Sequence, residues 1–321
     1  MVTRRTLEKI QRNLGFTLDF LEKTYHLTRI LHKIQQTEIL AKNLTLKGGT
    51  ALNFLYLDLP RLSIDIDFNY TGAIPRNFMK AARPFIDQSI QVVGDHLGYT
   101  VKEKDSSYIL SRYDLRYTTV RNTKDHVTIE INYLDRLPIG DSNTKKFVSL
   151  FPDLPTFSVP TYSLEELTAQ KIKACIERTE PRDIYDVSLL AAQLLNTGKT
   201  RKYVAVYYCM IEEDKTTNVL QRIEAYDLKK LRQELRQFVR NTEQFDAENI
   251  RKNAVEFLTK MVSFTTKEQQ FIETFYTKQN IIPELLFKEK PLLIDHPSLL
   301  FRLNSLKKKQ HRRSQKQLQR K

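Results

Sequence analysis

Residues 47–68 read KGGTALNFLYLDLPRLSIDIDF, and the end of this stretch places two carboxylates, Asp65 and Asp67, inside a short β-rich run. In a strand, successive side chains point to opposite faces, so the two carboxylates share one face and the apolar residues around them share the other. Like charges side by side on a sheet repel each other. The pair therefore requires solvent or a cation beside it.

The residues before this run form a second recognisable pattern, a short strand at 44–47 that ends at Gly48 and Gly49. We expect a helix from Thr50 onward, and a glycine turn that opens a helix presents free backbone N–H groups suited to a phosphate. The strand that carries the carboxylates can return beside this turn. Paired carboxylates and a phosphate cradle are what metal-dependent phosphoryl transfer requires, because Mg²⁺ prefers oxygen ligands.

Many sites of this kind add a third carboxylate from a neighbouring strand, and the segment 126–134 (HVTIEINYL) offers Glu130. The isoleucines on either side of Glu130 point to the opposite face of the predicted strand, so this acid also lies on a polar face. Three roles stay open for Glu130. The three are a metal ligand, a general base for the attacking hydroxyl, and the partner of Arg112 or Arg121 in an ion pair.

The remaining pattern predicts an α+β fold in which a small mixed sheet is flanked by helices and followed by an all-helical C-terminal half. Apolar residues recur at helical spacing over 3–44, and Pro75 begins another helix that ends near Gly98. Strands are expected at four alternating segments, and a connecting loop with one strand near its end is expected over 135–160. The segments are 99–104, 107–113, 115–121 and 126–134, with Asp114 in a turn. Helices are expected at 164–178, from Pro181 onward, and throughout the chain beyond Thr200.

Composition indicates a soluble globular protein with an uneven positive charge. The net charge is +14, and the last fifteen residues, 307–321, hold eight Lys or Arg and no acid. Such a tail attracts polyanions, RNA above all, although a merely solubilising tail is the alternative. No apolar run approaches the length of a membrane span, and no secretory signal is present. Two distant cysteines, Cys175 and Cys209, fit reduced thiols, so a cytoplasmic protein without a membrane partner is expected.

The combination of GGTAL at 48–52 with R-x-S-x-DIDF at 61–68 resembles the AbiEii/AbiGii family of nucleotidyltransferase toxins, which includes the MenT-type toxins. The core of that family is similar to polymerase β-type nucleotidyltransferases, whose signature is a glycine turn followed by a DhDh strand. The second half of the resemblance is the stretch 163–190, SLEELTAQKIKACIERTEPRDIYDVSLL, in which a lysine helix precedes an Arg-Asp-x-x-Asp helix. The resemblance covers roughly residues 45–195. Together with the pattern and charge of the rest of the chain, it predicts a nucleotidyltransferase core with N-terminal helices at 1–160, a helical domain at 161–300 that contributes to the site, and a basic tail at 301–321.

The resemblance also implies site residues and cofactors. Asp65 and Asp67 would hold Mg²⁺, with Mn²⁺ as the alternative ion, and the substrate would be a nucleoside triphosphate (NTP). Lys171 would act as a point charge on the triphosphate. The expected nucleotide-binding residues are Gly48, Gly49, Thr50, Arg61, Ser63 and Lys171. Lys47 is a further candidate phosphate contact, and a solvated surface lysine is the alternative.

Three further residues match the second helix of the family pattern, namely Arg182, Asp183 and Asp186. Asp183 and Asp186 are expected in the site as catalytic residues, and they share a helix face because they are three residues apart. A purely structural ion pair between these carboxylates and Arg182 or Lys171 is the alternative. For Arg61, the alternative to a phosphate contact is a surface cation.

The expected function is that of a toxin in a toxin–antitoxin system. It would transfer a nucleoside monophosphate (NMP) from an NTP to an RNA acceptor, with the 3′ end of tRNA as the leading case, and so inhibit translation and growth. A cognate antitoxin is expected as a partner. Two alternatives remain open: nucleotidylation or phosphorylation of a protein partner, and a catalytically silent nucleic-acid-binding module.

Overall fold

The computed structural model describes residues 2–240 and 245–318, with the backbone alone described at 213, 214 and 311–318. The chain folds into two compact units. The sheet unit comprises the chain up to Leu167 together with Tyr226–Asn249, and the helical unit comprises Thr168–Ala225 and the chain from Ile250 onward. The predicted domain boundaries stay predictions. The return of 226–249 to the sheet unit is a feature that the sequence did not indicate.

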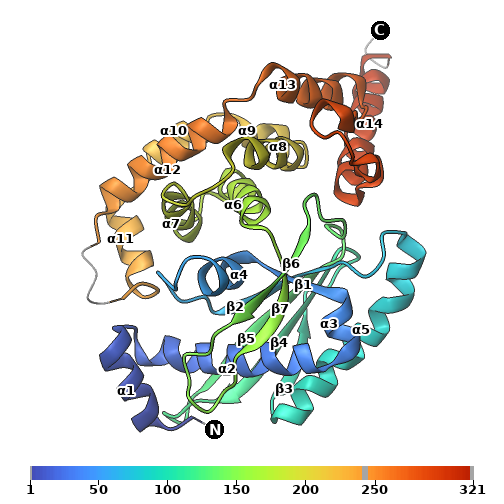
Figure 1. Ribbon diagram of the computed structural model, residues 1–321. Helices are drawn as coiled ribbons and strands as arrows, with labels where there is room; N and C mark the ends of the chain where they lie inside the picture. Colours follow the sequence, from blue (N-terminus) through green and yellow to red (C-terminus); the bar gives the residue numbers. More distant parts are fainter. Residues whose placement is uncertain (1, 241–244, 319–321) are drawn as a thin grey trace. The chain divides into compact units, whose positions relative to one another are not determined.

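The sheet unit contains seven strands in one mixed sheet, in the order β3-β4-β5-β2-β1-β7-β6 (Figure 1). The sequence of its elements is α1 (Arg4–Leu14), α2 (Leu18–Gln36), α3 (Glu38–Asn43), β1 (Leu44–Lys47), α4 (Gly48–Leu55), β2 (Asp65–Tyr70), α5 (Arg76–Leu97), β3 (Thr100–Lys104), β4 (Leu110–Thr118), β5 (Lys124–Asn132), β6 (Ser142–Phe147), β7 (Phe157–Tyr162) and, after the return, α11 (Leu228–Arg236). The α+β class predicted from the sequence is confirmed.

One face of this sheet is apolar and buried at the central strands β4, β5, β2 and β1. Ile66 and Phe68 of β2 and Ile129 of β5 have no exposed surface, and they pack in one core with residues of α2, α3 and α5 such as Ile30 and Ile90. Burial of a side chain of this size stabilises a fold by about 1.5–3 kcal/mol. Because side chains alternate along β2, this burial forces Asp65 and Asp67 to the opposite face.

Two strand predictions were wrong. The segments 107–113 and 115–121 share the single strand β4, which runs only from Leu110 to Thr118, and Asp114, expected in a turn, lies in its middle. Its carboxylate is buried, and two partners compensate for the loss of water. Lys104 Nζ lies 2.7 Å from Oδ2, and Thr128 Oγ1 donates a hydrogen bond to Oδ1 at 3.2 Å. The loop expected over 135–160 also contains β6, an edge strand whose mostly polar residues carry no apolar alternation.

The helical unit contains no strand among its described residues. Its elements are α6 (Leu164–Arg178, whose first turn belongs to the sheet unit), α7 (Pro181–Leu190), α8 (Thr197–Tyr208), α9 (Glu213–Thr216), α10 (Val219–Glu224), α12 (Ala247–Val262, whose first residues also belong to the sheet unit), α13 (Thr266–Glu273), a π-helix (Thr274–Lys278), 3₁₀-helices at Pro283–Leu285 and Pro291–Asp295, and α14 (Pro297–Leu318). The basic tail thus enters a helix, and its side chains from 311 onward lie outside the described residues. Within 2–240 and 245–318, no helix is long and apolar enough to cross a membrane.

Candidate active site

The Gly48–Gly49 turn lies directly against the polar face of β2. Gly48 has a φ of +69°, and a Cβ at this position would come within 2.2 Å of Asp67 Oδ2. Thr50 Oγ1 donates a hydrogen bond of 2.5 Å to the Asp65 carbonyl, which ties the first turn of α4 to the start of β2. The strand therefore returns beside the glycine turn, as the spacing of the two motifs predicted.

Gly49 faces two further residues that were predicted to bind the nucleotide. A Cβ at Gly49 would lie 2.8 Å from an Arg61 guanidinium nitrogen and 3.1 Å from Ser63 Oγ. Arg61 is only 2% exposed, so the surface-cation alternative is wrong for this residue. A buried guanidinium, a hydroxyl and a helix N-terminus that face the same glycine turn form a set of donors suited to phosphate oxygens.

The acids on the polar face belong to one row of charges that crosses four strands. Lys47 of β1 is the register partner of Asp67, Asp67 is the partner of Glu130, and Glu130 is the partner of Arg112 on β4. Arg112 Nη2 lies 2.7 Å from Glu130 Oε1. The ion-pair alternative proposed for Glu130 is thus present in the structure, with Arg112 and not Arg121 as the partner.

The residues present fit a divalent cation at Asp65 and Asp67. No cluster of three or more His, Cys, Asp or Glu side chains suited to a metal occurs within the described part of the chain. Mg²⁺ is nevertheless commonly held in nucleotide enzymes by one or two carboxylates, with substrate phosphates and water as the other ligands. Asp65 and Asp67 are both half-buried on one face, beside a cradle that an added Cβ would fill.

Substitution of Gly48 by alanine tests the contact between the turn and Asp67. A positive φ costs a non-glycine residue about 1–2 kcal/mol, and the new Cβ would also displace the Asp67 carboxylate. We expect Gly48→Ala to lower both the free energy of unfolding in urea and the rate of the nucleotide transfer that the resemblance implies. Gly98→Ala is the matched control, because Gly98 has a φ of +76° and nothing within 4 Å of an added Cβ. Equal activity losses in the two variants would contradict the assigned contact.

The loop that carries Arg61 is held by residues 238–240, which the sequence did not indicate. The Leu62 N–H donates to the Phe238 carbonyl at 2.9 Å, and Arg61 pairs with Val239 in an isolated antiparallel bridge. The Phe238 ring packs edge-to-face on Phe20 at 5.0 Å. This segment belongs to the part of the chain that returns to the sheet unit, and we infer that it positions Arg61 at the glycine turn.

Phe238→Ala should therefore weaken catalysis through Arg61. Loss of the ring removes its packing against Phe20, which anchors 238–240 beside the loop, and small displacements of a positioning group cost about ten- to a hundredfold in kcat/KM. We expect most of this loss in the KM for the NTP that the resemblance implies as substrate, measured by steady-state transfer assays. Phe78→Ala, at a ring that is 60% exposed, is the control. An unchanged KM in a folded Phe238→Ala protein would refute the positioning role.

In the helical unit, Lys171, Asp183 and Asp186 form a buried cluster. Lys171 Nζ lies 3.1 Å from Asp183 Oδ1 and 3.0 Å from Asp186 Oδ2, and both carboxylates are fully buried. Arg178, which was not predicted, donates two hydrogen bonds of 2.6 and 3.0 Å to Asp183. The spacing of Arg178, seven residues after Lys171, could have indicated it because residues seven apart share a helix face.

The structure thus gathers the predicted residues in two groups. The glycine turn, Thr50, Arg61, Ser63 and the strand acids lie together in the sheet unit, whereas Lys171, Asp183 and Asp186 lie together in the helical unit.

The buried cluster gives Asp183 a pH-dependent role in stability. Burial alone would raise the pKa of Asp183, but Lys171 and Arg178 outweigh it and hold the pKa below the usual 3.8. Because the folded pKa is depressed, ionised Asp183 stabilises the fold above about pH 4, and this contribution is lost as the pH falls further. The Tm difference between the wild type and Asp183→Asn should therefore shrink between pH 6 and pH 3. A constant difference over this range would contradict the assignment.

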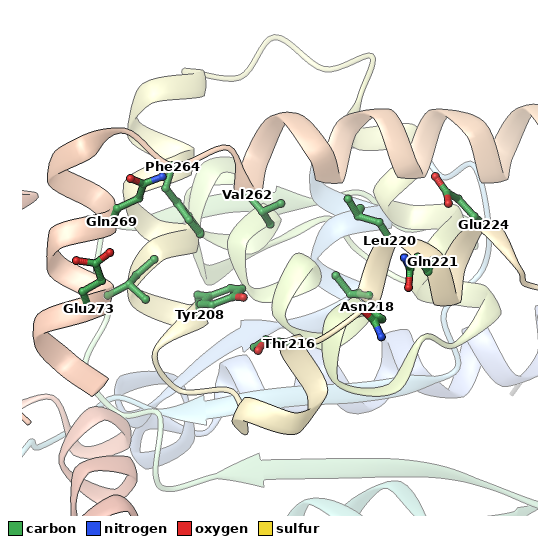
Figure 2. Close-up of a pocket in the computed structure, with 12 residues that line it drawn as sticks. Tyr208, Thr216, Asn218, Leu220, Gln221, Glu224, Val262, Phe264, Gln269 and Glu273 are labelled. Atoms are coloured by element: carbon green, nitrogen blue, oxygen red, sulfur yellow. The ribbon is translucent and has the colours of Figure 1, made fainter. Parts of the chain in front are cut away.

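The helical unit also holds a pocket of about 790 Å³ that no sequence feature indicated. Figure 2 shows Tyr208 and Phe264 toward the end of the pocket where Glu273 lies, with Glu224 at the other end. The two rings meet edge-to-face at 5.5 Å. None of its lining residues is Lys or Arg, so this pocket does not suit phosphate groups.

Comparison with known proteins gives the chain a family. The family model of the nucleotidyl transferase AbiEii toxin of type IV toxin–antitoxin systems matches residues 29–277, which is most of the chain. The chain belongs to this family. It is therefore a nucleotidyltransferase toxin, with an NTP as substrate and an antitoxin as expected partner. This assignment replaces the alternative of a catalytically silent nucleic-acid-binding module. None of the curated protein sequences matches it.

A solved structure supports the same fold for the AbiEii-family toxin described here. The structure titled MenT4, nucleotidyltransferase toxin Rv2826c from Mycobacterium tuberculosis H37Rv, is similar with a TM-score of 0.63 and 14% sequence identity. The match covers 95% of this chain and 99% of that chain. At this identity the likeness shows the fold, whereas the activity is carried by the family match.

Proposed function

We propose that the enzyme transfers an NMP from an NTP to an RNA acceptor, with the 3′ end of tRNA as the leading candidate, and releases pyrophosphate. The observation that carries this proposal is the Gly48–Gly49 turn, which faces Asp67 on one side and Arg61 with Ser63 on the other. Transfer at this end of tRNA would block aminoacylation, and translation and growth would stop. The proposal includes a cytoplasmic location, where RNA acceptors are present. Both cysteines are buried free thiols, which fits a reducing compartment of this kind.

In this proposal each group of residues has a separate role in the transfer reaction. The backbone N–H groups of the glycine turn, the Arg61 guanidinium and the Ser63 hydroxyl would bind phosphate oxygens and orient the triphosphate. Asp65 and Asp67 would hold Mg²⁺, or Mn²⁺ in its place. The cation, when bound, supplies Lewis-acid stabilisation of the phosphates. Lys171, held by Asp183 and Asp186, would supply positive charge for the triphosphate.

Glu130 receives a different role from the one that polymerase-like sites suggest. Arg112 Nη2 lies 2.7 Å from the Glu130 carboxylate. We therefore propose that Glu130 is part of the charge row beside Asp67. It would take the proton of the attacking hydroxyl only after its ion pair with Arg112 is broken. The ordinary metal set would then consist of Asp65 and Asp67 alone.

The positive charge supports RNA over a protein acceptor. No acid occurs from His296 to the C-terminus, and Lys307, Lys308 and Lys309 are exposed on α14. Each phosphate contact that Lys or Arg neutralises makes the affinity for a polynucleotide fall more steeply with salt. A protein acceptor carries no phosphate backbone, so these lysines would not contribute to its binding in the same way.

Deletion of residues 307–321 tests this choice of acceptor. Binding of total tRNA should weaken at least several-fold at physiological salt, and the slope of log K against log[salt] should flatten because up to eight cations are lost. Labelling of RNA from each α-³²P NTP in turn then identifies both the nucleotide and the acceptor. Label in a protein band, with no label in RNA, would replace the RNA proposal with the protein-modifying alternative.

A further inference from the structure

The polar face of the sheet continues from the two site acids over β5 and β4 to the edge strand β3. Asp65 is the register partner of Thr128 on β5. Thr128 pairs in turn with Asp114 on β4, and Asp114 pairs with Lys102 on β3. Register partners lie on one face of a sheet, and side chains alternate along each strand. The even-numbered residues of β3, β4 and β5 therefore share the face of Asp65 and Asp67, and we call this part of the sheet the basic face.

The basic face carries more cations than its acids can pair with. Asp114 pairs with Lys104 at 2.7 Å. Glu130 pairs with Arg112 at 2.7 Å. The other cations of this face, which we call the surplus cations, are exposed and form no ion pair within the described residues: Lys102, Arg116 and Lys124. The fold itself therefore leaves these three positive charges uncompensated on the face that also carries the site acids.

A hollow of about 520 Å³ lies beside the surplus cations, and Arg116 and Lys124 are among the residues that line it. Two acids line it as well, but each already has a lysine partner, which for Asp125 is Lys23 of α2 at 3.1 Å. Lysine and arginine without a carboxylate partner bind phosphate oxygens through charge-assisted hydrogen bonds. The hollow therefore suits an anionic group of this kind.

The distance of the surplus cations from the site acids fits the backbone of an acceptor strand. Neighbouring strands lie about 4.8 Å apart and residues rise by about 3.4 Å, so the register places the Cα atoms of all three about 12–14 Å from that of Asp65. Transfer requires the terminal hydroxyl of the acceptor beside Asp65 and Asp67, and the phosphates of the nucleotides before it then follow within a short distance. A groove of cations that tracks the backbone is how proteins bind single-stranded nucleic acid without reading its sequence.

We propose that the basic face binds the backbone phosphates of the acceptor RNA next to its reactive end. The acceptor strand would enter over the edge strand β3 and cross β4 and β5 to reach Asp65 and Asp67. This inference rests on the proposed transfer to RNA and adds the surface that positions the acceptor. The basic tail would attract the polyanion as a whole, whereas the surplus cations would hold the end that reacts.

A triple variant that changes all three surplus cations to glutamine tests the proposal in transfer assays with total tRNA. The KM for tRNA should rise at least about tenfold, and the slope of log K against log[salt] should flatten by about 2, at about 0.7 for each phosphate contact with a single strand. The KM for the NTP, and kcat at saturating tRNA, should stay within about twofold of the wild type.

The matched control removes the same charge from three exposed residues of α1, as Arg5→Gln, Lys9→Gln and Arg12→Gln in one chain. Its KM for tRNA should stay within about twofold of the wild type. An equal rise in both triple variants would show that only net charge matters and would overturn the proposal. If the wild type labels RNA and the first variant keeps its KM for tRNA, the basic face is refuted and the transfer reaction stands. A wild type that labels no RNA would overturn both.

Photo-crosslinking tests which part of the acceptor lies on the basic face. Both native cysteines are buried, so a photoactivatable maleimide on an introduced thiol reports alone. On Thr100→Cys, at an exposed residue of the basic face, the label should crosslink the nucleotides next to the end that receives the NMP. The same label on Gln88→Cys, on the helix α5 that packs against the apolar face, should not. Crosslinks from Thr100→Cys that are confined to nucleotides far from the reactive end would contradict the proposal.

Discussion

Asp67→Asn should lower nucleotide transfer by about 10²- to 10³-fold, the size of loss seen when one preorganised charge-stabilising group is removed from an active site. The substitution keeps the size of the side chain, so the contact with Gly48 survives and only the negative charge is lost. Without this charge the polar face of β2 retains one carboxylate, Asp65, for a divalent cation. The loss should therefore appear in the metal dependence, as a higher Mg²⁺ concentration for half-maximal transfer.

The control for this variant is Glu103→Gln, which removes one exposed carboxylate from β3 of the same sheet. Transfer by Glu103→Gln should stay within about twofold of the wild type, and Glu103→Gln should unfold at a temperature similar to that of the wild type, because surface substitutions usually change stability by less than about 0.5 kcal/mol. If Asp67→Asn kept near-wild-type transfer at limiting Mg²⁺, the carboxylate pair on β2 would not be the metal site.

Lys171→Met should have the second largest effect, on stability as well as on activity. It leaves two fully buried carboxylates, Asp183 and Asp186, without the ammonium group between them. Loss of one partner from a buried ion pair costs about 3–5 kcal/mol because the remaining charge is left uncompensated. Arg178 still pairs with Asp183, whereas Asp186 loses its ion pair with Lys171. Urea unfolding measures it directly.

A second variant separates the structural role of Lys171 from its proposed role with the triphosphate. Lys171→Met combined with Asp186→Asn removes the uncompensated charge, so it should recover much of the lost stability. Transfer should remain at least about 10²-fold below the wild type if the lysine charge acts on the nucleotide. Recovery of transfer together with stability would make the cluster purely structural, the alternative that the sequence left open.

The parts of the fold that depend on local patterns were predictable from the sequence. The strand 44–47, the helix after the glycine turn and the strand with Asp65 and Asp67 follow from residue types within one short stretch, and the alternation along β2 also gave the buried face correctly. Asp114 misled the prediction because an aspartate in a β-rich run usually marks a turn, whereas here Lys104 and Thr128 satisfy its carboxylate inside β4.

Other parts of the candidate site depend on contacts between distant segments. The residues 238–240 meet the Arg61 loop across more than 170 positions of sequence, and nothing in either segment specifies that pairing. The partner of Glu130 was narrowed to two arginines by the sequence, and the strand register selected Arg112. Composition and local spacing therefore predict which residue types the site contains. The contacts that position Arg61 and Arg112 join distant segments, so only the folded structure shows them.

Nucleotide transfer at the polar face of β2 and the glycine turn is the central proposal. The most direct test incubates the purified protein with total tRNA, Mg²⁺ and each NTP labelled with ³²P at the α- or the γ-phosphate, beside Asp65→Ala. We expect that α-label enters RNA from one NTP, that γ-label is released as pyrophosphate, and that Asp65→Ala does neither. Incorporation of γ-label, or undiminished transfer by folded Asp65→Ala, would contradict the proposal.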